Sequence, residues 1–300
     1  MTRYALLSVP EGGNRVFPLD SLGAVGRARL SLGDVGRASI SLYRNHAHSA
    51  VWTKGAQVIG IAAAQPRSGP KSWEASHLFL KSDDESGAAR LIEQLCAGVQ
   101  RRRGERLFLR MERGDRMVDV ATRSGFVIGA QEILYLGRRN TTLIHSLNEV
   151  REKAPADDHD LFRLYNALTP SEVRFATGMA FEQWASSRDL GRGPCREFVY
   201  LREGQVRGWI NVSQRFGFGR IIITTHPEDD VGLIALMDYG LARLRGDRVQ
   251  CLADESNALL SRLLEQRGYG VQTEYVTLVR QFAVNVKSAE SSRVVVSVSS

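Results

Sequence analysis

The sequence predicts an α/β (α+β) protein made of two copies of one mixed-sheet unit, with helices on both faces of the sheet. Three observations lead to this fold class. A strand with period-2 alternation at Trp73–Leu80 is followed by a short turn and an amphipathic helix. The same order of strands and helices returns after residue 195. The 300 residues, 43% of them hydrophobic, suffice for one large domain or two ordinary ones.

The strand, turn and helix around Trp73–Val99 organise the first copy. Leu78 and Leu80 fall on one face of the strand and Phe79 on the other. Ser82 and Glu85 have the spacing of a capping box, which predicts a helix start. The helix carries an apolar stripe that must face a sheet: Ala88, Leu91, Ile92, Leu95 and Val99. The turn contains Gly87 and exposes backbone N–H groups, a generic place to hold a pyrophosphate.

The remaining elements of the first copy follow from turn signals and apolar runs. Two strands joined at Lys54-Gly55 form a predicted hairpin, and the Trp73 strand extends it to an antiparallel meander. After the helix we expect a strand at 106–111, a short helix at 117–122 and strands over 126–136. Gly125 ends the short helix as a C′ glycine. One crossover makes a parallel strand pair.

The second copy repeats this order. It is preceded by two predicted helices, at 161–168 and 171–186. Leu107 and its counterpart Val249 are 142 positions apart, and each copy has a glycine-aromatic pair after its last helix, Gly125-Phe126 and Gly268-Tyr269. We therefore expect an N-terminal unit at 1–138, a linker at 139–160, a C-terminal unit at 161–283 and a tail at 284–300.

Charge and composition narrow the class of protein. The formal net charge is +7, and the densest basic run, Arg101–Arg103, follows the predicted helix, where cations complement the helix dipole. No aromatic residues interleave with it, so we expect no nucleic-acid partner. No run of 18 apolar residues and no signal peptide are found, so we expect no membrane span and a cytoplasmic location. The widely spaced Cys96, Cys195 and Cys251 indicate reduced core thiols rather than a metal site.

The repeated order of elements resembles the GNAT superfamily of acyl-CoA-dependent N-acetyltransferases, in a tandem form. The resemblance covers about residues 50–138 and 161–283. The family's phosphate turn usually reads Arg/Gln-x-x-Gly-x-Gly/Ala, and the matching stretch here is 84–89, in which Gly87 and Ala89 agree. The stretch at 229–232 matches less well, and both turns carry carboxylates where a pyrophosphate would lie.

The resemblance implies an acetyl-CoA site in the first unit. The residues that it assigns to the cofactor lie at the end of the strand and in the turn: Leu78, Phe79, Leu80, Ser86, Gly87, Ala88, Ala89 and Arg90. It also implies direct attack of a neutral amine on the thioester, with a carboxylate as base, for which Glu74 is the candidate. The alternative for Glu74 is a solvent-facing charge at a strand end. The family's usual tyrosine acid is replaced by Ala121 and Leu264, neither of which donates a proton.

Two functions of different class remain open from the sequence. The first is an N-acetyltransferase acting on a small-molecule or peptide primary amine, with the second unit walling the acceptor cleft. The second is a non-catalytic tandem protein that binds acyl-CoA or another ligand, or serves in an assembly. The missing tyrosines and the acidic turns favour the second, and the small residues Gly87 and Ala89 favour the first.

Overall fold

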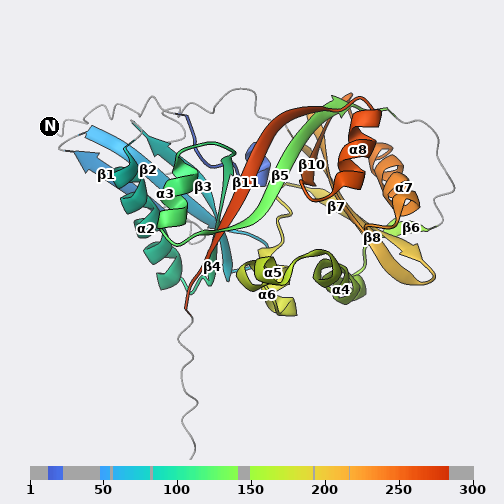
Figure 1. The fold of residues 1–300 in the computed structure, drawn as a ribbon, viewed down its shortest axis with the longest axis horizontal. Helices are drawn as coiled ribbons and strands as arrows, with labels where there is room; N and C mark the ends of the chain where they lie inside the picture. Colours follow the sequence, from blue (N-terminus) through green and yellow to red (C-terminus); the bar gives the residue numbers. More distant parts are fainter. Residues whose placement is uncertain are drawn as a thin grey trace, which may run out of the picture.

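In the part of the chain that the structure describes, eleven strands form one mixed sheet with helices on both faces (Figure 1). The strand order is β1-β2-β3-β4-β11-β5-β10-β9-β8-β7-β6. This computed structural model describes residues 13–22, 48–54, 57–81, 84–140, 149–191, 193–215 and 217–283.

The first copy has the expected order of elements. In chain order it comprises η1 (Leu19–Ser21), β1 (His48–Lys54), β2 (Gln57–Pro66), β3 (Ser72–Leu80), α2 (Glu85–Arg101), β4 (Arg106–Glu112), α3 (Met117–Arg123) and β5 (Val127–Arg138). Strands β1, β2 and β3 form the antiparallel meander, and β4 is parallel to β3 as the crossover requires. The N-cap of α2 is Asp84, not the expected Ser82, which lies outside the described residues.

The second copy begins at β6. Its elements are β6 (Val150–Glu152), η2 (Pro155–Asp157), α4 (Asp158–Leu168), α5 (Ser171–Thr177), α6 (Phe181–Ser187), β7 (Cys195–Arg202), β8 (Gln205–Arg215), β9 (Phe218–Thr225), α7 (Asp230–Leu241), β10 (Arg248–Asp254), α8 (Ala258–Gln266) and β11 (Gly270–Gln281). The predicted repeat of element order is confirmed. Gly125 and Gly268 end α3 and α8 with φ values of 80° and 79°, which glycine adopts without strain.

The two copies exchange their last strands. Strand β5 of the first copy pairs with β10 of the second, and β11 of the second pairs with β4 of the first. The two exchanged strands also pair with each other in the centre of the sheet. All three pairings are antiparallel. The copies are therefore joined by a continuous ladder of backbone hydrogen bonds.

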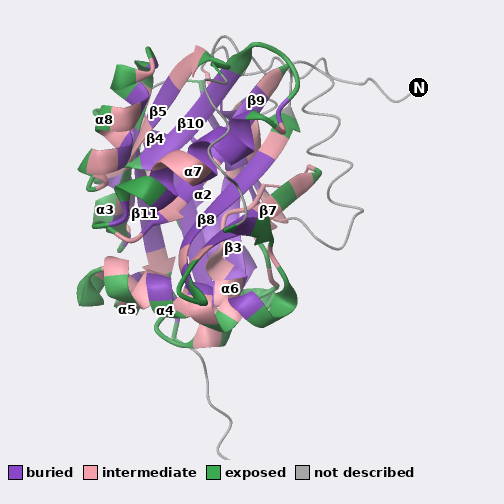
Figure 2. Ribbon diagram, turned by 90° about the vertical axis from the view of Figure 1, so that its right-hand side faces the viewer, coloured by how far each residue is buried: buried purple, intermediate pink, exposed green. Residues whose placement is uncertain are grey.

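Alternation along the strands divides the core between two faces. Leu107 and Leu109 of β4 pack with α2 and α3, whereas Phe108 packs with α5 on the opposite face. Likewise Tyr135 of β5 lies in the core beneath α7 and α8, and Leu134 lies on the face that η1 covers. Buried residues accordingly concentrate in the strands, and the helices expose their outer sides (Figure 2).

One expectation about the middle of the chain was wrong. The single helix expected at 171–186 is two helices, α5 and α6, separated by a turn in which Gly178 has a φ of 153°. A side chain there would meet the backbone of Trp184 at 2.7 Å, so the turn requires glycine. The described part of the expected linker at 139–160 includes β6, which pairs with β7 at the sheet edge.

Candidate functional site

Each copy contains one place where two parallel strands part. Strand β3 pairs with β4 only over Ser72–Glu74, and β9 pairs with β10 only over Gly219–Ile222. Beyond these residues both members of each pair continue, so their backbone groups face a gap instead of a neighbouring strand. We call the gap between β3 and β4 the first gap and the gap between β9 and β10 the second gap. In parallel sheets ligands bind at such carboxyl ends of strands.

The first gap is filled by the chain itself. The backbone N–H of Arg15 donates to Leu78 O of β3 at 3.0 Å, and that of Phe17 donates to Arg110 O of β4 at 2.8 Å. The side chain of Asn14 accepts from the Leu78 N–H at 2.8 Å, and Val16 is fully buried in the core. Residues 14–17 therefore bridge the parted strands as a short inserted strand.

The turn expected to hold a phosphate in the first copy is also occupied. The Asp84 carboxylate accepts from the backbone N–H groups of Ser86 at 3.0 Å and Gly87 at 3.1 Å. The ring of Trp52 packs against Gly87, where an added Cβ would lie 1.6 Å from a ring atom. The glycine is therefore required for packing of β1 against α2. The Asp84 carboxylate therefore already occupies the position at the start of α2 that an anionic ligand would take.

The other residues assigned to the cofactor lie around this turn. Leu78, Phe79, Leu80 and Ala88 are buried, Ala89 is half-buried, and Ser86 and Arg90 are exposed. Leu78, Leu80 and Ala88 belong to the core that α2 shares with the sheet. The arrangement thus weighs against the prediction that an acyl-CoA lies in the first copy.

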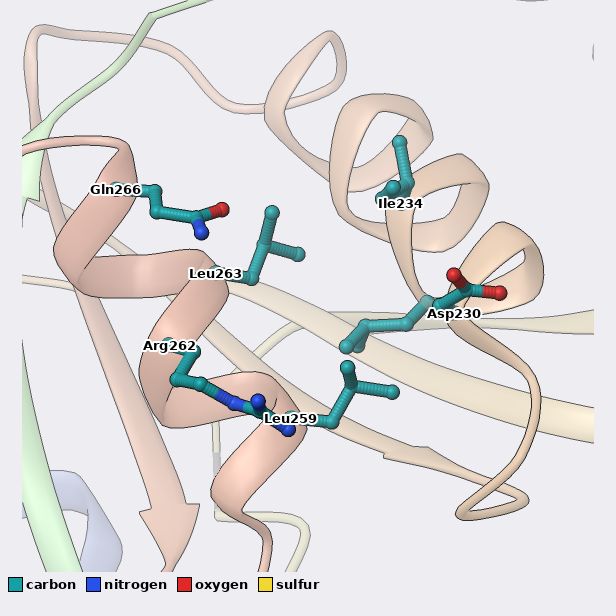
Figure 3. Close-up of a pocket in the computed structure, with 7 residues that line it drawn as sticks. Asp230, Ile234, Leu259, Arg262, Leu263 and Gln266 are labelled. Carbon is teal, nitrogen blue, oxygen red and sulfur yellow. The ribbon is translucent and has the colours of Figure 1, made fainter.

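No described residue fills the second gap, which forms part of a large cleft that we call the central cleft. Its volume is about 1090 Å³. The strand ends Ile222–Thr225 and Leu252–Asp254 line one part of it, and α4, α5 and the loop after α6 line another. Leu259 and Arg262 of α8 belong to both the central cleft and a smaller groove of about 230 Å³ between α7 and α8, the α7–α8 groove (Figure 3).

The start of α7 repeats the arrangement at α2. Asp229 is 1% exposed, and its Oδ1 accepts from the Gly232 N–H at 2.9 Å. The Asp230 carboxylate accepts from the Val231 N–H at 2.9 Å. A Cβ on Gly232 would lie 2.6 Å from the ring of Tyr200, so this glycine too is used for helix–sheet packing.

A cluster of buried charges lies at the sheet side of the central cleft. Arg110 of β4 donates two hydrogen bonds to Glu132 of β5, at 2.7 and 3.0 Å, and a third at 2.8 Å to Asp189. Thr277 of β11 also donates to Glu132. These residues line the cleft together with Arg67, whose guanidinium lies 3.8 Å from the centre of the Phe108 ring. Three strands, β4, β5 and β11, and two loops, from both copies, therefore meet here.

Glu74 lies directly behind this cluster, not at a solvent-facing strand end. Its side chain accepts a hydrogen bond of 2.7 Å from Gln65, and its second oxygen lies 3.7 Å from Arg67 Nε. Burial raises the pKa of Glu74 to about 7, the charge of Asp189 adds to the rise, and Arg67 opposes it. Although burial opposes it, the charges of Arg110 and Arg67 lower the pKa of Asp189. The two carboxyl groups share Arg67, so one of them is disposed to carry a proton near neutral pH.

Another part of the cleft wall is aromatic. Tyr165, Trp184 and Trp209 line it, and Arg188 lies over both tryptophan rings at 5.3 and 5.1 Å. The Thr177 hydroxyl donates to a backbone carbonyl, so it accepts the 2.6 Å hydrogen bond of the Tyr165 hydroxyl. Burial raises the pKa of Tyr165, which keeps this phenol protonated.

Sequence reasoning missed Arg67, Arg110, Glu132 and Asp189. One signal was present, because the strand 106–111 alternates arginine and phenylalanine with leucine and methionine. In a strand buried on both faces, such arginines require buried acidic partners on the same face. Those partners come from remote parts of the chain, which the alternation does not identify.

Comparisons with known proteins agree with this topology. A structure from Pyrococcus horikoshii, described as a possible acetyltransferase, aligns at a TM-score of 0.50 and 12% identity, over 83% of this chain and 78% of that one. A GCN5-related N-acetyltransferase from Sphaerobacter thermophilus aligns at 0.49 and 15%, over 79% and 80%. A tandem GNAT protein of the clavulanic acid pathway aligns at 0.49 and 11%, over 79% and 84%. The chain has the GNAT fold. No family model and no curated protein sequence matches it.

The two copies of this chain differ in one feature that bears on ligand binding, the gap between their parted strands. Both have an aspartate at the start of the helix after the parted strands, and only the second has a gap that opens into a cleft. Among the described residues no group of side chains is arranged to hold a metal ion, and no helix is long and apolar enough to cross a membrane.

Proposed function

We propose that the protein is an N-acyltransferase whose acyl donor, a thioester such as acetyl-CoA, lies in the second gap. A primary amine would occupy the central cleft. The observation that carries the proposal is that the second gap opens directly into this cleft, whereas residues 14–17 fill the first gap. The donor site is accordingly proposed for the second copy, in place of the first-copy site expected from the sequence.

Residues 14–17 indicate what kind of ligand such a gap accepts. They are an extended chain whose amide groups bond to both parted strands, at Leu78 O and at Arg110 O. An extended ligand that bears amides can complete an open strand edge in the same way. The pantetheine arm of an acyl thioester is extended and has two amides. The strand ends Ile223–Thr225 and Ala253–Asp254 pair with β8 and β5 on their outer sides, and on the side of the second gap they have no strand partner among the described residues.

The cleft walls suit an amine acceptor. Asp189 and Glu132 offer carboxylate oxygens to an amine beside their bonds to Arg110, and the wall of Tyr165, Trp184 and Trp209 accommodates an apolar body. In the reaction the amine nitrogen bonds to the thioester carbonyl carbon, the carbon–sulfur bond breaks, and the thiolate takes a proton from solvent. The proton released by the amine passes to a carboxylate. We assign that role to the Asp189–Glu74 pair, with Asp189 facing the cleft and Glu74 behind it.

The experiment is an acyl-transfer assay with a blocking variant. Purified protein is given acetyl-CoA and a panel of primary amines, and released thiol is measured. Thr224→Trp fills the second gap from β9, whereas Thr122→Trp places the same bulk on the exposed surface of α3. We expect Thr224→Trp to weaken donor binding at least ~10-fold and Thr122→Trp to leave it unchanged. Equal effects of the two variants would contradict the proposed site.

The carboxylate-capped helix starts favour a second candidate, a non-catalytic protein that binds a ligand in the same cleft. Both helix starts hold a carboxylate where an anionic donor needs N–H groups. The same assay distinguishes the two functions. Saturable binding in the cleft without release of thiol from any amine in the panel would support the non-catalytic function.

A further inference from the structure

We infer that the protein recognises its acyl donor by the thioester arm and not by a nucleotide diphosphate. The donor class is then the acyl-pantetheine thioesters in general, whether the arm is free, part of coenzyme A or attached to a carrier protein. The inference rests on the proposed acyl transfer and names its donor. It starts from a disagreement between the GNAT fold, which implies acyl-CoA, and the residues that this chain places at its two helix starts.

Three of the first four backbone donors of α7, which could otherwise hold a diphosphate, are already engaged. A helix leaves its first N–H groups free for an anion. Here the N–H groups of Val231 and Gly232 donate to Asp230 and Asp229, and that of Leu233 is bonded within the helix to Asp229 O. A phosphate would have to displace a carboxylate from the second and third N–H groups of the helix, those of Val231 and Gly232.

Asp229 is held firmly in this position. It is 1% exposed, and the Tyr200 ring packs against the neighbouring Gly232. Its Oδ2 makes no hydrogen bond among the described residues, and the nearest cations, Arg202 and Arg207, lie 3.9 Å from the carboxylate. These arginines therefore compensate a buried negative charge. A diphosphate bound to these arginines would be repelled by the adjacent Asp229 carboxylate.

The α7–α8 groove does not supply the missing contacts. Its lining is largely apolar and includes Ile234 of α7 and Leu259 and Leu263 of α8 (Figure 3). Arg262 is the one cation among its described lining residues, and Asp230 lies in the same groove. The volume of about 230 Å³ is small beside the 1090 Å³ of the central cleft, which holds the reacting groups.

An aspartate also caps the corresponding helix of the first copy. At α2 the Asp84 carboxylate takes the N–H groups of Ser86 and Gly87. The first gap is filled there, so Asp84 caps the helix without any bearing on a ligand. It provides a matched control, because it can be changed in the same chemical way as Asp229.

The test compares donors that share the thioester arm and differ in what the arm carries. Acetyl-CoA, S-acetylpantetheine and an acetyl-phosphopantetheinyl carrier protein are each assayed with one accepted amine. We expect kcat/KM values for acetyl-CoA and S-acetylpantetheine within about 3-fold of each other and no inhibition by millimolar ADP. A preference for acetyl-CoA above about 30-fold would overturn the inference and leave the proposed function intact. If no thioester binds or reacts, both fail.

The assay with the carrier protein shows whether the thioester arm is presented free or attached to a protein. A kcat/KM value well above that for S-acetylpantetheine would support a protein-borne donor, and a similar or lower value would support a free one.

Variants test whether the aspartates at the start of α7 cause this choice of donor. Asp229→Asn and Asp230→Asn keep an accepting oxygen and remove charge, so we expect acetyl-CoA to gain roughly 3- to 10-fold over S-acetylpantetheine. Asp84→Asn should change neither donor. Equal gains from Asp84→Asn and Asp229→Asn would contradict the inference.

Discussion

The carboxyl group of Glu74 has neighbours from both copies of the chain. Gln65 and Arg67 come from the end of β2 and the turn after it, and Asp189 follows α6 more than a hundred positions later. The strand pattern placed Glu74 on β3 correctly, and the resemblance proposed it as a base. Its raised pKa depends on burial beneath elements of the second copy. A single sequence does not reveal that burial.

Replacing Glu74 by glutamine should change how stability depends on pH. The pKa of Glu74 is raised from 4.5 to about 7, so the folded protein binds more protons than the unfolded chain between these values. Its contribution to stability is therefore complete below about pH 4.5 and is lost as pH rises to about 7. Glu74→Gln removes that loss, and we expect the variant to gain roughly 1–3 kcal/mol over wild type on going from pH 5 to pH 8.

Urea unfolding at several pH values between 5 and 8 measures this difference. The lowered pKa of Asp189 acts only below its usual range, so it does not contribute in this window. The exposed Glu172 on α5 provides the control, since Glu172→Gln should leave the pH dependence of wild type intact. Parallel curves for wild type and Glu74→Gln would show that Glu74 is not the buried acid described above.

At the scale of elements, the sequence predicted most of the helices and strands and missed the inserted segment. An amphipathic stripe located α2, and the glycine-aromatic pair at Gly268-Tyr269 located the end of α8. Residues 14–17 have no comparable signal, because a short extended segment inside a gap needs neither periodicity nor turn residues. Its partners, Leu78 and Arg110, were both read as members of complete strands.

Removing the Asn14 side chain should loosen this inserted segment. Asn14 donates to Val16 O and Ser76 O and accepts from the Leu78 N–H, at a site that is 7% exposed. We expect Asn14→Ala to lower the free energy of unfolding by roughly 1–3 kcal/mol, because buried hydrogen-bonding groups lose their partner. Donor affinity should stay unchanged, since the proposed donor site lies in the second gap. Tighter donor binding by Asn14→Ala would indicate a first-copy site instead.

At the scale of the whole molecule, the exchange of β5 and β11 was beyond prediction from this sequence. Strand patterns identify which segments are strands and which faces they bury, but not which strands they pair with. The last strands of the two copies occupy equivalent positions after Gly125 and Gly268. Pairing within each copy and pairing across copies would therefore leave the same local patterns. Exchange also brings Glu132 of β5 and Thr277 of β11 to the cleft.

The exchange argues for one cooperative unit, whereas the sequence predicted two domains at 1–138 and 161–283 with a linker between them. Strand β11 makes its full ladder with β4 and β5, both in the first copy, so unfolding of either copy removes the partners of a central strand in the other. We expect calorimetry of the full chain to give a single transition whose calorimetric and van't Hoff enthalpies agree. Two resolved transitions would instead support independent domains. Thr277→Val, which removes the hydroxyl bonded to Glu132, should then shift only one of the two, whereas in a single unit it shifts the whole transition.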